Sequence, residues 1–136
     1  MENVKTLKTI SWIAAIVSAI IMLQTLYFKF SAAPESVYIF STLGVEPWGR
    51  IGSGIGELIA SILILIPATR WIGSVLGLGI ISGAIIAHIT KLGVEVQGDG
   101  GYLFILALVV FISCGICLYL DKHKLKLMYV RFFPSR

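Results

Sequence analysis

Charged residues are scarce in this chain of 136 residues, of which only 13% are Asp, Glu, Lys or Arg. Ordinary soluble domains carry about 25% charged residues, and disordered chains are rich in charge, so both classes are excluded. The chain has two cysteines, too few for a disulfide-rich secreted scaffold. What the chain has instead is apolar surface: 57% of its residues are hydrophobic and its mean hydropathy is +0.94. We therefore expect an integral membrane protein.

Four apolar stretches make up most of the sequence, and each is close to the roughly 20 residues that a helix needs to cross a bilayer core. They are predicted at residues 9–30, 47–67, 71–90 and 102–120. Pro47 and Pro67 bracket the second stretch, because proline fits the first turn of a helix and stops a helix at its far end. The sequence thus predicts one domain, residues 1–136, that is an all-α membrane protein built as a four-transmembrane-helix bundle.

Lys and Arg are distributed unequally between the two sides of these spans. One side carries Lys5, Lys8, Arg70, Lys122, Lys124, Lys126, Arg131 and Arg136, and the other carries Lys29, Arg50 and Lys91. Basic residues stay on the cytoplasmic side, so both termini are expected to be cytoplasmic in a multi-pass protein of a cell membrane, such as a bacterial inner membrane. The basic tail 121–136 also holds apolar residues, which favours contact with anionic membrane lipids over nucleic acid.

The segments that join and line the spans give two further expectations. Pro34 begins a short extra helix in the first outer loop, and Gly44 ends it. Small residues recur every four positions in the second and third spans, which favours close packing of helices in lipid. The rows are Gly52, Gly56 and Ala60; Gly73 and Gly77; and Gly79, Gly83 and Ala87.

Glu57 is the least expected residue of a membrane span. It stands ten residues after Pro47, which is about 15 Å along a helix and near the middle of the bilayer. An acidic side chain there costs about 2.5–3.5 kcal/mol on insertion scales and is a candidate functional residue. Arg50 lies seven residues earlier, nearly two turns, so the two side chains share one face of the helix.

Other polar residues of the spans are expected at the same level, in the outer half of the bundle. They are Lys29, Glu46 and His88, with Gln24 and Tyr27 as weaker candidates. Polar side chains that face one another inside a bundle favour a site for a ligand or cofactor. The alternative is a structural ion pair of Glu57 with Arg50 or Lys29 that fixes the register of the helices.

The chain offers little for metal or redox chemistry by itself. His88 and His123 lie on opposite sides of the membrane, and no cluster with the spacing of metal ligands is present, so no metal site is predicted. Cys114 and Cys117 form a CxxC pattern inside the fourth span. Two interpretations stay open: small apolar residues of the core, or a redox pair, although the apolar neighbours do not favour a reactive thiolate.

The segment from Phe40 to Leu58, together with Lys29 before it and His88 after it, resembles the DoxX-like family of integral membrane proteins. The most specific part is Gly49-Arg50, Gly54 and Glu57-Leu58, and the resemblance covers roughly residues 9–120. It implies a four-span fold and a shared polar set of Lys29, Arg50, Glu57 and His88. The family takes its name from a subunit of an archaeal thiosulfate:quinone oxidoreductase, and other relatives are assembly or trafficking factors.

Two functions from different classes follow. In the first, the bundle binds an apolar molecule with a polar head, a quinone or a lipid, and acts as a membrane subunit beside a redox or other membrane protein partner. In the second, the chain is a non-catalytic scaffold or assembly factor whose polar network is structural. A small-solute or proton carrier, which would require an oligomer, is a weaker third interpretation.

Overall fold

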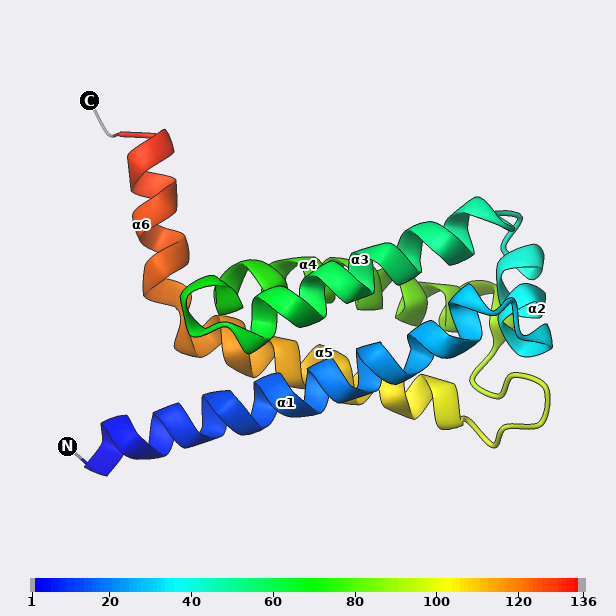
Figure 1. The fold of residues 1–136 in the computed structure, drawn as a ribbon, viewed down its shortest axis with the longest axis horizontal. Helices are drawn as coiled ribbons and strands as arrows, with labels where there is room; N and C mark the ends of the chain where they lie inside the picture. Colours follow the sequence, from blue (N-terminus) through cyan, green and yellow to red (C-terminus); the bar gives the residue numbers. More distant parts are fainter. Residues whose placement is uncertain (1, 135–136) are drawn as a thin grey trace.

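The computed structural model describes residues 2–134, and every regular element in that range is a helix (Figure 1). Arg136 of the basic tail lies outside the described residues. In chain order the elements are α1 (Glu2–Phe30), α2 (Pro34–Thr42), α3 (Trp48–Leu65), η1 (Pro67–Thr69), α4 (Arg70–Ala87), η2 (His88–Leu92), α5 (Tyr102–Leu120) and α6 (Lys122–Phe132). Here η1 is a short 3₁₀ turn and η2 is a π-helical turn.

Four of these helices are long and apolar enough to cross a membrane: α1, α3, α4 with its flanking turns, and α5. They form a closed ring in which α1 packs on α3, α3 on α4, α4 on α5 and α5 on α1. Neighbours run in opposite directions, so the start of α1 and the whole of α6 lie at one end of the bundle, and α2 crosses the other end (Figure 1). We call these the α6 end and the α2 end. The fold is that of a multi-pass membrane protein.

The helix bounds differ from the sequence prediction by more than one residue at three ends. The first helix begins at Glu2 and not at residue 9, because the polar residues before the apolar run do not interrupt helical hydrogen bonding. The second ends at Leu65, since Ile66 precedes Pro67 and is extended with ψ 117°. The third does not stop at residue 90 but continues through η2 to Leu92. The bounds of the fourth are as expected.

Arg70 fastens the α6 end of the bundle. The sequence places it among the basic residues that flank the spans, but the structure leaves only 4% of it exposed. Its Nε donates to the carbonyl oxygen of Ile64 at 2.8 Å, and its Nη1 donates to the hydroxyl of Ser11 at 3.0 Å. The guanidinium carbon also lies 4.2 Å from the centre of the Trp12 ring. Arg70 therefore joins α1, α3 and α4 and does not act as a free charge at the membrane surface.

Of the two predicted rows of small residues on α4, only Gly73 and Gly77 bring this helix against its neighbours. A Cβ added to Gly73 would lie 2.5 Å from the backbone nitrogen of Ile64 on α3, and one added to Gly77 would lie 3.0 Å from Sγ of Cys114 on α5. By contrast, a Cβ added to Gly79 or Gly83 would meet nothing within 4 Å. The prediction that Gly79 and Gly83 pack against a helix is therefore wrong. The close contacts are made by Gly73 and Gly77, on a different face of α4.

We expect Gly73→Ala to destabilise the bundle, because α3 and α4 must separate to admit the methyl group. Overpacking of this kind costs about 1–3 kcal/mol. Gly52→Ala is the matched control: a Cβ there meets nothing within 4 Å, and alanine favours a helix over glycine by about 0.5–1 kcal/mol. The free energies of unfolding in detergent should move in opposite directions. A Gly73→Ala protein as stable as the control would contradict the close approach of α3 and α4.

Candidate functional site

A buried ion pair joins α1 to α3 in the half of the bundle nearest the α2 end. Nζ of Lys29 lies 2.7 Å from Oε1 of Glu57, and the two side chains are only 15% and 7% exposed. Thr25, one turn before Lys29 on the same face of α1, donates its hydroxyl to the other carboxylate oxygen at 2.9 Å. Each oxygen of Glu57 thus has a partner, which a carboxylate needs at this depth in a membrane.

Arg50 also attaches α3 to the end of α1, beside the ion pair. Its Nε donates to both carboxylate oxygens of Glu46, at 2.8 and 3.1 Å, and its Nη1 donates to the backbone carbonyl oxygen of Lys29. That carbonyl is in the last turn of α1, where helical partners run out. Lys29 is therefore held twice by α3, at its backbone by Arg50 and at its ammonium by Glu57. The shared face of Arg50 and Glu57 explains how one helix makes both contacts.

Beside the ion pair lies a cavity of about 620 Å³, lined by residues of α1, α2, α3, α4, α5 and the turns between them. Most of its wall is apolar, with side chains such as Phe28, Ile39 and Leu106. The polar residues that line it are Gln24, Thr25, Lys29, Glu35, Ser36, Ser53, Glu57, His88, Asp99 and Tyr102. A largely apolar cavity of this size with a few convergent polar groups is typical of a site for a small organic molecule.

Two features shape the access to this cavity. The lining includes Gln24, Glu35 and Tyr102, which are exposed, so the cavity reaches the surface of the bundle. Gly79 and Gly83 form part of the wall on α4, where their missing side chains leave the space open. The row of small residues that the sequence assigned to helix packing therefore makes room in the cavity instead.

His88 lines the same cavity and lies at the first position of the π-helical turn η2. Its ring is buried, with Nδ1 2.9 Å from the carbonyl oxygen of Gly93 and the ring edge against Phe104. Because a carbonyl oxygen only accepts, Nδ1 carries a hydrogen, and whenever the ring is neutral its Nε2 is an acceptor. Within residues 2–134, no hydrogen bond engages Nε2. Turns of this type are frequent at functional sites.

Asp99 is a site residue that the sequence analysis did not identify. Its carboxylate accepts the backbone N–H groups of Val96 at 3.0 Å, Gly101 at 2.8 Å and Leu103 at 3.2 Å, and so it closes the amino end of α5. Partial burial raises the pKa of Asp99, but these three N–H donors and the attraction of nearby His88 lower it more, so the net pKa lies below its ordinary value of 3.8. An Asp shortly before an apolar run was the available signal.

The structure brings some of the predicted residues together and separates others. Lys29, Glu57, His88 and Gln24 line the cavity, whereas Arg50 and Glu46 support its wall from outside. Tyr27 is 73% exposed and does not line the cavity, because it lies on the opposite face of α1 from Thr25 and Lys29. The sequence analysis missed Thr25, although it lies one turn from Lys29.

Cys114 and Cys117 lie in the packed core, away from the cavity. Both thiols are free and buried. Cys114 packs against Gly77, and Sγ of Cys117 lies 3.7 Å from the backbone oxygen of Ser11. Neither residue lines the cavity. These contacts are those of small core residues that let α5 approach α1 and α4.

The described residues contain no group of three His, Cys, Asp or Glu side chains that could hold a metal ion. What the cavity offers is an ammonium donor, a carboxylate, an imidazole acceptor and an apolar wall, which together suit an uncharged molecule with oxygen atoms at one end. Comparison with protein-family models, with curated proteins and with solved structures found no match.

We expect Asp99→Asn to weaken the fold by about 1–3 kcal/mol at neutral pH, because the amide keeps only one of the two oxygens that accept backbone N–H groups and loses the charge that strengthens these bonds. Because the pKa of Asp99 is lowered by folding, the stability it contributes is present above pH 3.8 and is lost as the pH falls through its folded value. The thermal midpoints of the wild type and the variant should therefore converge in acid. Glu95→Gln, in the same loop and exposed, is the control and should leave the pH profile unchanged. A constant gap between wild type and Asp99→Asn would contradict this account.

Proposed function

We propose that this chain is a DoxX-like integral membrane protein whose cavity binds an apolar molecule with an oxygen-bearing head, a quinone or a lipid. The observation that carries the proposal is the position of the Lys29–Glu57 ion pair, which lies at the wall of a cavity of about 620 Å³ that is otherwise mostly apolar. A purely structural ion pair has no need of an open cavity in front of it.

The charges and hydrogen bonds of the lining favour a head of this chemistry. Lys29 has donors beyond the one that faces Glu57, since an ammonium carries three hydrogens, and these suit a carbonyl or hydroxyl oxygen. Nε2 of His88 accepts, which suits a hydroxyl such as that of a quinol. Apolar side chains of α1, α2 and α5 would surround the rest of the molecule. The DoxX-like resemblance supports the same polar residues.

In this proposal the chain supplies the binding site, and a partner membrane protein of a quinone- or lipid-linked redox system supplies or removes electrons. The excess of basic residues at the α6 end supports a cytoplasmic position for that end, in a membrane such as the bacterial inner membrane. The cavity then opens in the outer half of the bilayer. Glu57, Lys29 and His88 orient the head of the bound molecule.

A second candidate function is a scaffold or assembly factor, and one observation favours it. The polar network is complete without a ligand: Glu57 is paired with Lys29 and Thr25, and Arg50 with Glu46 and the carbonyl oxygen of Lys29. Such a network needs no ligand, and fixing the register of α1 against α3 can be its whole role. The two proposals differ in whether the cavity is occupied.

Filling the cavity tests which proposal is correct. We expect a Gly79→Leu/Gly83→Leu protein to fold normally, because a Cβ at either position meets nothing within 4 Å and the rest of the side chain has the cavity to occupy, and to exclude a bound molecule. After purification in mild detergent, mass spectrometry of the organic extract should show a quinone or a lipid retained by the wild type. We predict that retention falls at least about tenfold in the variant.

The control for this experiment is Gly52→Leu/Gly115→Leu, which adds the same side chains at helical glycines that have open space but lie outside the cavity. The control should retain the molecule as the wild type does. Equal retention by all three proteins, or no amphiphile in the wild type beyond that in the filled variant, would overturn the binding proposal and favour the scaffold.

A further inference from the structure

The direction of α6 is fixed by contacts at the α6 end of the bundle. The helix follows α5 after a break at Asp121, and it runs across the bundle axis instead of along it (Figure 1). Nζ of Lys124 donates to the carbonyl oxygen of Pro67 at 3.1 Å and lies 3.7 Å from a carboxylate oxygen of Asp121. Because the four long helices cross the membrane, a helix transverse to them at their ends lies along the membrane surface.

The residues of α6 are arranged as in a helix that lies in a membrane interface. Leu125, Met128 and Phe132 follow each other at spacings of three and four, so they share one face. Basic residues border that face, with Lys122 and Lys126 on one side and Lys124 and Arg131 on the other. Phe132 and Phe133 remain 70% and 68% exposed, more apolar surface than a short helix in water would leave uncovered.

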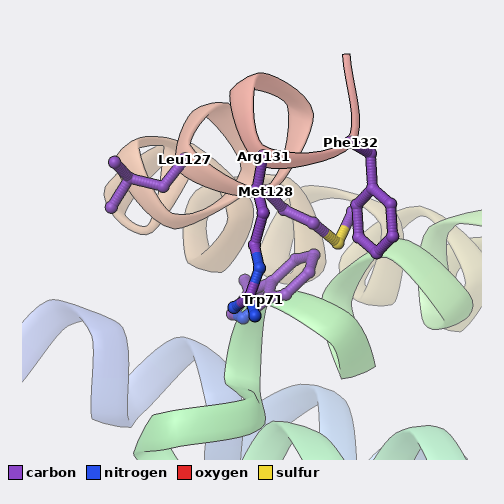
Figure 2. Close-up of a pocket in the computed structure, with 5 residues that line it drawn as sticks. All are labelled: Trp71, Leu127, Met128, Arg131 and Phe132. Carbon is purple, nitrogen blue, oxygen red and sulfur yellow. The ribbon is translucent and has the colours of Figure 1, made fainter. Parts of the chain in front are cut away.

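A groove lies between α6 and the start of α4, and Met128 and Phe132 of the apolar face line part of it. It has a volume of about 460 Å³ and is lined by Trp71, Leu127, Met128, Arg131 and Phe132. Arg131 extends from α6 toward the ring of Trp71, with Met128 and Phe132 beside it (Figure 2). Trp71 belongs to the first turn of a membrane-spanning helix, and tryptophan at that position lies at the level of the lipid head groups. The groove therefore places a guanidinium beside apolar rings at head-group depth.

We propose that α6 and this groove bind anionic phospholipid, with Arg131, Lys122 and Lys126 at the phosphate groups and the apolar face of α6 toward the acyl chains. Charge complementarity selects this occupant: α6 carries Lys122, Lys124, Lys126 and Arg131 and no acidic residue. A bilayer surface also meets the bases and the exposed apolar side chains at once. This inference concerns the end opposite the cavity and does not rest on its ligand.

The test compares amide hydrogen exchange of residues 122–133 in the full chain reconstituted in nanodiscs. One set of discs holds phosphatidylcholine alone, and the other holds about 30% phosphatidylglycerol, which gives the surface a negative potential. We expect exchange to slow about tenfold or more in the anionic discs. Soluble inorganic phosphate added to the neutral discs should give no such protection, because the apolar face needs the bilayer.

A charge variant tests the same proposal independently. Lys122→Gln/Lys126→Gln/Arg131→Gln keeps Lys124, which holds α6 to η1, and should lose the difference between the two kinds of disc. Lys5→Gln/Lys8→Gln is the control, since it removes exposed charges from α1 at the same end of the bundle. Equal exchange of the wild type in both kinds of disc would overturn the proposal. A triple variant that keeps the full lipid dependence would also overturn it. The wild-type comparison holds whether or not the variant folds.

Discussion

The structure depends on the double attachment of Lys29 to α3. Glu57 binds the ammonium, and Arg50 binds the backbone carbonyl at the end of α1. A charge buried in a bundle needs a partner, so the pair forces α1 and α3 into one register. That register places Thr25 against the carboxylate and leaves the face of α1 beside them as a cavity wall. The site and the packing of this half of the bundle therefore have the same cause.

Glycines of α4 have different roles at the two ends of the bundle. Toward the α6 end, Gly73 and Gly77 let the helices touch, and Arg70 of α4 binds a backbone carbonyl of α3 and a hydroxyl of α1, so the interior is closed. Toward the α2 end, Gly79 and Gly83 of the same helix border the open space of the cavity. A glycine thus either lets a neighbouring helix pack closely or leaves open space, depending on whether a neighbour lies opposite it. The bundle is tight at one end and hollow at the other.

The sequence predicted the four long helices well, because apolar length is a local property. It also predicted that Glu57 and Lys29 are polar residues at one level, and left open whether Glu57 pairs with Lys29 or Arg50. That choice depends on which helices are neighbours and on how far Arg50 reaches, and neither follows from spacing along one chain. The assignment of Gly79 and Gly83 to packing was wrong for the same reason. Asp99 was missed because its partners are backbone N–H groups, which no side-chain pattern reveals.

The most direct test of the Lys29–Glu57 pair is a double-mutant cycle of Lys29→Met and Glu57→Gln, with the free energy of unfolding measured in detergent. Removal of one member of a buried pair leaves the other charge uncompensated and costs about 3–5 kcal/mol. The account predicts that the double variant is markedly more stable than the sum of the two single effects, with a coupling of about 1–3 kcal/mol. Single effects that add to within about 0.5 kcal/mol would show that the two side chains do not meet, and would contradict the account.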